Sequence, residues 1–159
     1  MGEWTNGLPR GWTSEKPLSS EVLDLIKKNE PDVIDLRSPG FAAFAGIGAL
    51  DYGLKEIFDT KVYIEKYEGA QKVLEARQRD GVIPTGPIFS DIQQVQGRML
   101  PKGLKSAKGG WPCTNVSIAG DESGFDDDGK PSTLFFQMTR IVVARLITIS
   151  PPVPNHFLI

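Results

Sequence analysis

The most reactive side chain in this sequence is Cys113, the only cysteine of the chain. It follows Pro112 and the pair Gly109-Gly110, residue types that favour an exposed turn. A thiol on such a turn can act as a nucleophile once it is deprotonated. Isolated cysteines are more often small buried hydrophobic residues, so Cys113 alone leaves both interpretations open.

Glycines and acids at the ends of expected strands indicate a second kind of chemistry, the binding of a nucleoside cofactor. Phe44-Ala45-Gly46-Ile47-Gly48 joins a predicted strand to a helix, where glycines let the backbone approach a ligand closely. Glu65 closes the next strand, 19 positions after Gly46, and could accept hydrogen bonds from ribose hydroxyls. Asp91 repeats this placement one strand later. Ordinary strand-end turns with solvated acids are an alternative of equal weight.

The remaining charged clusters give weaker signals. Asp126 to Asp128 are best explained as a solvated loop, because their spacing is not that of a metal site. Four basic residues between Arg98 and Lys108 could contact a phosphate backbone, but a charged surface loop explains them more simply. One cysteine and one histidine cannot build a usual zinc site, so no metal is predicted.

The composition is that of one globular domain. The 159 residues are 40% hydrophobic and 24% charged, with a formal net charge of −2 that gives no general attraction to nucleic acid. The sequence has no apolar run of about 18 residues and no signal-peptide pattern. We therefore expect a cytoplasmic protein, or a nuclear one in a eukaryote, that is neither secreted nor inserted in a membrane.

The alternation of short apolar runs with amphipathic segments predicts an α/β fold with a mostly parallel sheet. Residues 1–40, rich in proline and glycine, are expected to precede a domain at 41–159 as an N-terminal extension. Strands are expected at 41–45, 61–65 and 87–92, before Cys113, and at 156–159. Helices are expected at 19–28, across Leu50, Leu54, Ile57 and Phe58, at 67–79, and at 132–148.

Four segments, taken together and in order, resemble the motifs of the cytosine-5 DNA methyltransferases. Residues 109–117 (GGWPCTNVS) are similar to the family's GGFPCQ-x-x-S, and residues 44–50 (FAGIGAL) to its FAGIGG. Glu65 and Asp91 fall where the family contacts ribose and adenine, and residues 132–140 (STLFFQMTR) are similar to its SGLFFE helix. The resemblance covers about 41–159 and implies a Rossmann-like methyltransferase fold with an incomplete sheet.

The resemblance also implies a cofactor, a substrate and site residues. Cys113 would be the catalytic nucleophile, adding to C6 of a cytosine flipped out of double-stranded DNA. The cofactor, S-adenosyl-L-methionine, would give its methyl group to C5. Its contacts would be Phe44, Ala45, Gly46, Ile47, Gly48, Glu65, Asp91, Ile92 and Pro112.

The family's general acid is the Glu of an ENV motif that follows a strand resembling residues 156–159. The sequence stops at Ile159, before that Glu, the QxRxR motif and the target-recognition domain of the family. We therefore expect an amino-terminal part of the enzyme that is inactive alone. Its last strand would lie at a sheet edge, which predicts association with a complementing C-terminal chain.

Several positions depart from the family pattern. Ala42 stands where the family has Asp, Ala49 where it has Gly, and Thr114 where it has Gln. Residues 103–108 are polar where the family has an apolar strand. These changes favour, as an alternative, a non-catalytic remnant that binds S-adenosylmethionine or serves as an interaction module. A fragment of a transfer-RNA cytosine-5 methyltransferase, which shares the motifs, is a further alternative.

Overall fold

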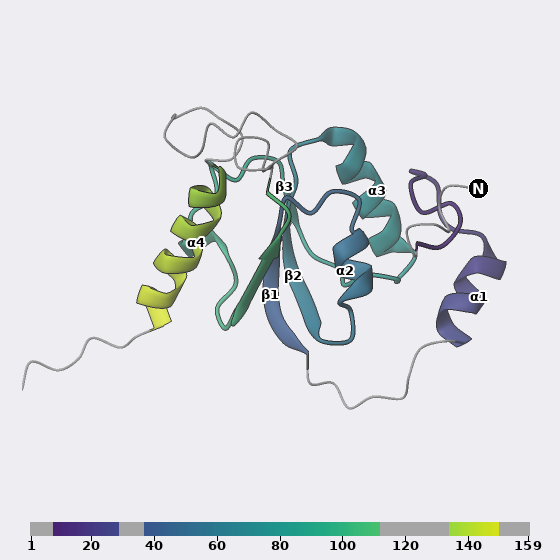
Figure 1. Cartoon of the computed structure of the whole chain (residues 1–159), viewed down its shortest axis with the longest axis horizontal. Helices are drawn as coiled ribbons and strands as arrows, with labels where there is room; N and C mark the ends of the chain where they lie inside the picture. The colour runs from purple at the N-terminus through teal and green to yellow at the C-terminus, as the bar shows by residue number, and fades with distance from the viewer. Residues whose placement is uncertain (1–7, 29–36, 112–133, 150–159) are drawn as a thin grey trace, which may run out of the picture. The chain divides into compact units, whose positions relative to one another are not determined.

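The computed structural model describes residues 8–28, 37–111 and 134–149, and the strands among them form one sheet. These strands are β1 (Ser38–Ala43), β2 (Phe58–Ile64), β3 (Ile88–Phe89) and β4 (Ser106–Gly109). They lie in the order β3-β2-β1-β4, and every neighbouring pair is parallel (Figure 1). The predicted α/β fold with a Rossmann-like parallel sheet is confirmed.

The carboxyl ends of the four strands are level with one another. Ala43 of β1 is paired with Ile64 of β2 on one side and with Gly109 of β4 on the other. Ile64 is paired in turn with Phe89 of β3. The segments that leave these strands therefore start from one edge of the sheet, which is the edge where open α/β sheets bind ligands.

Strand β1 begins earlier and ends earlier than the sequence predicted. It covers Ser38–Ala43 instead of 41–45, because Phe44 turns the chain away with a φ of 53°. The pairing of β1 with β2 shifts by one residue between Gly40 and Phe41. At Gly40 an added Cβ would lie 2.4 Å from the Ser106 carbonyl oxygen and 2.5 Å from the Phe58 ring, so only glycine fits there.

The helix after β1 is shorter than predicted. α2 covers Ala49–Gly53, and the chain then makes a turn to the start of β2 at Phe58. The prediction that Leu54, Ile57 and Phe58 continue the helical face was wrong. Ile57 is 65% exposed, while Phe58 is buried as the first residue of a strand.

The next helix matches its prediction closely. α3 covers Glu68–Arg79, against a predicted 67–79, and lies on the same side of the sheet as α2 (Figure 1). Its buried face contains Ala70, Val73, Leu74, Ala76 and Arg77. In the N-terminal segment, α1 covers Ser20–Lys28, against a predicted 19–28, with Ile26 buried.

The core of this region joins the N-terminal segment to the sheet. Its buried members are Trp12, Leu18, Ile26, Ala42, Tyr63, Leu74, Val82 and Ile83. Burial raises the pKa of the Tyr63 phenol, which donates a hydrogen bond of 2.7 Å to the Pro84 carbonyl oxygen. Residues before position 41 thus supply a substantial part of the core behind β1 and β2.

A second compact unit contains the 3₁₀ helix η2 (Gly97–Met99) and α4 (Leu134–Ile149). Arg140 of α4 donates a hydrogen bond of 3.0 Å to the Val95 carbonyl oxygen, and Gly97 lies against Ala144. α4 confirms the long apolar helix predicted at 132–148 over the part of that range that the structure describes. The strand predicted at 156–159 lies outside the described residues.

Candidate functional site

The loop that follows β1 has an unusual backbone. Phe44, Gly46 and Gly48 have φ values of 53°, 56° and 78°, all in the left-handed region. Glycine adopts this region freely, whereas a side chain such as that of Phe44 is strained there. Such strain in a loop at the carboxyl edge of a parallel sheet is frequent at ligand sites. We call residues 44–48 the glycine loop.

The side chain of Glu65 is hydrogen-bonded to the backbone of the glycine loop. It follows β2, and its Oε2 accepts a hydrogen bond of 2.7 Å from the Gly46 N–H. Its Oε1 accepts one of 2.8 Å from the Tyr67 N–H. Each carboxylate oxygen can accept more than one hydrogen bond, so this arrangement fixes the carboxylate and leaves capacity for a ligand.

The two glycines of the loop differ in their surroundings. A Cβ added at Gly46 would meet no atom within 4 Å, whereas one at Gly48 would lie 3.0 Å from Leu74 and 3.2 Å from Ile83. A side chain at Gly48 would press on Leu74 and Ile83 and would also be strained by the φ of 78°, so packing and backbone conformation both favour glycine there. Gly46 faces open space, which is where a ligand could approach the backbone.

A cavity of about 260 Å³ lies along this edge of the sheet. It is lined by Ala42, Ala43, the glycine loop up to Ile47, Ala49, Leu50 and Asp51, and by Lys108, Gly109 and Gly110 at the end of β4. The lining is mostly apolar, as is usual for a small-molecule site. The cavity thus joins the ends of β1 and β4.

A buried ion pair lies in the wall of this cavity. Lys108 Nζ is 2.8 Å from Asp51 Oδ1, and the two side chains are 6% and 1% exposed. Thr60 donates a hydrogen bond of 2.7 Å to the same Asp51 oxygen. Burial lowers the pKa of Lys108, and Asp51 partly offsets that effect. This pair was not predicted from the sequence, because Lys108 was expected in a charged surface loop.

That assignment was wrong for one of the four basic residues and right for the others. Arg98, Lys102 and Lys105 are exposed, whereas Lys108 is buried in β4. The position of Lys108 within a strand leading to the Gly-Gly pair was a signal that could have shown this. Its ammonium lies 4.2 Å from the centre of the Phe58 ring.

The other predicted cofactor residues follow β3. Asp91 is partly buried and Ile92 is 5% exposed, two and three residues after the last residue of that strand. The strand itself has only two paired residues instead of the six expected at 87–92. The structure thus places the glycine loop and Glu65 in direct contact, with Asp91 and Ile92 after the strand beside them.

Pro112 and Cys113 lie outside the described residues. The structure describes the chain up to Trp111, two residues after the end of β4. The predicted fourth strand before Cys113 is confirmed as β4. The roles predicted for Pro112 and Cys113 stay predictions.

Comparison with known proteins decides the family. The family model of the C-5 cytosine-specific DNA methylases matches residues 41–147. The chain belongs to this family. The match begins within β1 and extends into α4, so it contains the glycine loop, Glu65, Asp91 and Cys113.

Curated relatives of the chain are Type II methyltransferases. The chain is 34% identical over 98 residues to M.CviJI of Paramecium bursaria Chlorella virus IL3A, covering 62% of this chain and 25% of that protein. It is 30% identical over 104 residues to M.Bsp6I of Bacillus sp. (strain RFL6), covering 64% and 31%. It is 35% identical over 100 residues to M.HhaI of Haemophilus parahaemolyticus, covering 62% and 28%. The matched part thus spans between a quarter and a third of these relatives.

Within 8–28, 37–111 and 134–149, no helix is long and apolar enough to cross a bilayer. In the same ranges, no three His, Cys, Asp or Glu side chains are grouped so that they could hold a metal ion.

Proposed function

We propose that this chain carries the S-adenosylmethionine site and the catalytic nucleophile of a DNA cytosine-5 methyltransferase. The observation that carries the proposal is the bond between Gly46 and Glu65. It holds a carboxylate beside an open stretch of backbone at the carboxyl edge of a parallel sheet. A nucleoside with adjacent hydroxyl groups and a polar tail is the ligand that such a pair suits.

The residues present fit this cofactor. Gly46 has room for a ligand where a Cβ would stand, and the carboxylate of Glu65 has lone pairs left for the ribose hydroxyls. Phe44 would lie against the adenine, and Gly46 and Gly48 would admit the methionine portion. Asp91 would accept a hydrogen bond from the adenine amino group, with Ile92 packing beside it. When bound, the cofactor supplies an electrophilic methyl group.

Cys113 would perform the covalent step on the DNA. Its thiolate forms a bond to C6 of a flipped-out cytosine, and the electron pair of the C5–C6 double bond then makes C5 nucleophilic. After C5 accepts the methyl group, loss of the C5 proton and breakage of the S–C6 bond restore the double bond and free the thiolate. Pro112 would shape the turn that presents the thiol. The negative charge that develops on the ring requires a general acid near N3.

In the family that acid belongs to the ENV motif, for which residues 1–159 supply no match. We therefore propose that methyl transfer needs further protein, provided as a longer chain or as a complementing C-terminal chain. The substrate would be double-stranded DNA. The family match and the Type II methyltransferase relatives favour DNA over transfer RNA. We further propose that the protein acts in the cytoplasm, as part of a restriction-modification system.

Calorimetry with S-adenosylhomocysteine tests the cofactor site. We expect the 159-residue chain to bind it, and Glu65→Gln to weaken binding by about 10-fold, because one charge-assisted acceptor is lost. Asp59→Asn is a matched control, since Asp59 is an acid on β2 that pairs with exposed Lys61. Absence of binding by the unaltered chain would refute the cofactor proposal.

Covalent trapping tests the nucleophile. The protein is mixed with a duplex containing 5-fluorocytosine and with the methyl donor, with and without a C-terminal part taken from M.HhaI. We expect an adduct only in the complete mixture and none with Cys113→Ser. If the chain binds the cofactor but never forms an adduct, the chain is a non-catalytic remnant that binds S-adenosylmethionine. The departures from the family pattern at Ala42 and Ala49 favour that alternative.

A further inference from the structure

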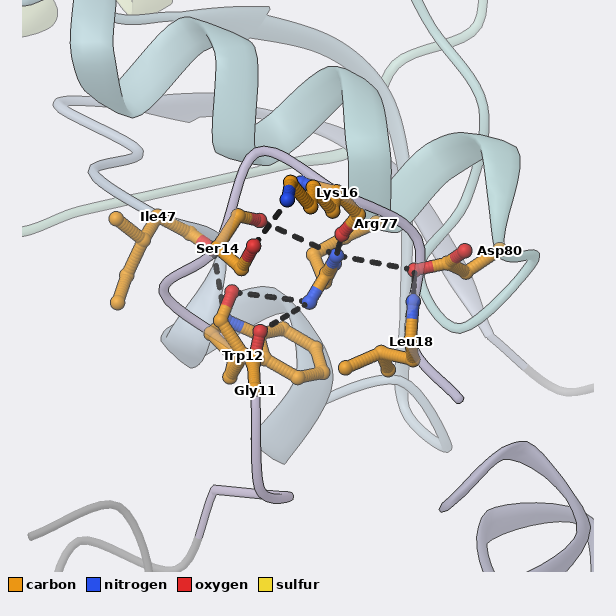
Figure 2. A network of polar contacts seen from close by, with 8 residues as sticks. All are labelled: Gly11, Trp12, Ser14, Lys16, Leu18, Ile47, Arg77 and Asp80. Atoms are coloured by element: carbon orange, nitrogen blue, oxygen red, sulfur yellow. Dashed lines mark hydrogen bonds and ion pairs between the residues drawn. The ribbon is translucent and has the colours of Figure 1, made fainter. Parts of the chain in front are cut away.

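The segment that precedes the family match wraps around one buried side chain. Arg77 of α3 is 0% exposed, although arginine is almost never fully buried without partners. Its guanidinium donates hydrogen bonds to the carbonyl oxygens of Gly11 (3.0 Å), Trp12 (3.0 Å), Ser14 (3.3 Å) and Lys16 (Figure 2). We call residues 8–19 the N-terminal loop. Its backbone oxygens take the place of water around this cation.

An acid completes the arrangement. Asp80 Oδ2 lies 3.2 Å from Arg77 Nη2 and accepts a hydrogen bond of 3.1 Å from the Leu18 N–H (Figure 2). The Leu18–Asp80 hydrogen bond links the N-terminal loop to the end of α3, and the Asp80–Arg77 ion pair holds the guanidinium in place. Charge-assisted hydrogen bonds are roughly twice as strong as neutral ones, so the loop is firmly held in this conformation.

The N-terminal loop in turn contacts the glycine loop. Trp12, which is 0% exposed, donates a hydrogen bond of 2.9 Å from its indole Nε1 to the Ile47 carbonyl oxygen (Figure 2). Its ring packs against Tyr52 of α2, with ring centres 4.7 Å apart. Trp12 therefore touches the backbone of the glycine loop and the helix that follows it.

This contact fixes one peptide plane of the glycine loop. The Ile47 carbonyl and the Gly48 N–H belong to the same planar unit and point in opposite directions. The carbonyl oxygen is held by Trp12, and the Gly48 N–H donates a hydrogen bond of 3.1 Å to the Ala45 carbonyl oxygen. This plane rotates about ψ of Ile47 and φ of Gly48, and because glycine can adopt many conformations, the plane could otherwise turn easily.

We propose that Trp12 is a positioning residue for the cofactor site, and that the N-terminal loop is the element that preorganises the glycine loop. The effect on the cofactor rests on the function proposed above, whereas the effect on the glycine loop does not. A site that is already ordered loses less conformational entropy on binding, so Trp12 should increase affinity without touching the ligand.

The test uses Trp12→Phe, which keeps an aromatic ring beside Tyr52 and removes the indole N–H. Val62→Ala is the control, because Val62 is fully buried in β2 and is not a member of the core cluster that contains Trp12. Amide hydrogen exchange is measured in the glycine loop and in β2 of the free 159-residue proteins. Exchange in β2 reports the loss of overall stability, against which exchange in the loop is compared.

We expect Trp12→Phe to speed exchange in the glycine loop about five-fold more than in β2, the effect of losing one hydrogen bond. Val62→Ala should speed both equally. Affinity for S-adenosylhomocysteine should fall about five-fold in Trp12→Phe at a temperature where both variants are folded, and stay within two-fold in Val62→Ala. Equal acceleration in loop and strand for both variants would overturn the proposal.

A measurement on the unaltered protein tests the Trp12 hydrogen bond even if the Trp12→Phe variant does not fold. The Trp12 indole N–H should exchange slowly in the free protein, and more slowly still when S-adenosylhomocysteine is bound. Rapid exchange of this proton in the folded protein would contradict the assigned hydrogen bond. If the unaltered protein binds no S-adenosylhomocysteine, the proposed function fails, while the exchange comparison still decides the role of Trp12 in the loop.

Discussion

Gly46 and Gly48, three and five residues after the end of β1, have different roles, which a pair of substitutions can separate. At Gly46 an added Cβ meets nothing within 4 Å, so Gly46→Ala should cost only the left-handed backbone strain, about 1 kcal/mol. We expect S-adenosylhomocysteine binding to be lost, because the methyl group occupies the ligand's approach. Calorimetry and urea unfolding of the same sample give both values. Retained affinity would show that Gly46 does not face the ligand.

Gly48→Ala should destabilise the fold more than Gly46→Ala does. Its Cβ would lie 3.0 Å from Leu74, in addition to the left-handed strain, so we expect a loss of stability of about 2–3 kcal/mol in urea unfolding. A loss no larger than that of Gly46→Ala would contradict the packing role assigned to Gly48.

The pair Asp51–Lys108 provides a further prediction about single residues. Lys108→Met leaves a carboxylate that is 1% exposed without its cation, and such a change typically costs about 3–5 kcal/mol. The double variant Asp51→Asn/Lys108→Met removes both charges and should recover most of that loss. A double-mutant cycle measured by urea unfolding checks this. If Lys108→Met alone is neutral, the ion pair does not contribute to folding.

Of the two ends of strand β1, only the carboxyl end could be predicted from the sequence. The motif at residues 44–48 predicted the strand-to-turn boundary to within two residues, because its glycines mark where the chain adopts left-handed backbone. The start of the strand was not predictable in the same way. Ser38, Pro39 and Gly40 have low strand propensity, and they form β1 because Gly40 lets β2 and β4 approach closely.

Gly40→Ala tests that explanation. The new methyl group would overlap the Ser106 carbonyl oxygen, and backbone atoms cannot move aside cheaply. We expect the β1–β4 pairing to separate near this position and the unfolding midpoint to fall, by the equivalent of about 3 kcal/mol or more. Hydrogen exchange at the Lys105 N–H, which is bonded to the Pro39 carbonyl oxygen, should accelerate. Unchanged exchange there would mean that the sheet accommodates a side chain at position 40.

The helices also differ in how well the sequence predicted them. α3 was predicted to within one residue because its buried positions recur at helical spacing, with Gly81 just after its end. The helix predicted across Leu50 and Phe58 was too long, because Phe58 pairs in the sheet, an interaction that local spacing cannot reveal. The contacts of Trp12 and Arg77 were missed for a similar reason, because the Trp12–Ile47 hydrogen bond joins residues 35 positions apart and the Arg77–Trp12 hydrogen bond joins residues 65 positions apart.

The buried Lys108 also predicts how the free energy of unfolding of the chain depends on pH. Its pKa in the folded chain is lowered from 10.5, so over the range just below 10.5 the unfolded chain binds more protons than the folded one. The contribution of Lys108 to the free energy of unfolding therefore rises with pH there. Tyr63, whose pKa is raised, acts in the opposite direction as the pH approaches and passes its ordinary value of 10.0.

Unfolding by urea between pH 8 and 9.5 measures this dependence in two proteins that both keep Tyr63, whose contribution grows only toward the top of this range. We expect a steeper rise in the unaltered protein than in Asp51→Asn/Lys108→Met, which lacks the titrating group. Equal slopes in the two proteins would show that the Lys108 pKa is not lowered by folding.

The family, the parallel sheet and the turn at the glycine loop could all be predicted from the sequence, since each depends on short runs of residues. The support behind the site could not, because it consists of Lys108, Asp51, Arg77 and Trp12, whose importance lies in contacts distant in the chain.

The convergence of the N-terminal loop on one guanidinium has a consequence for proteolysis. If one stretch of the loop lifted away alone, Arg77 would be left in the interior with part of its oxygen shell missing, so the loop should detach as a unit. Trypsin cleavage after the exposed Arg10 would then report cooperative detachment rather than local fraying.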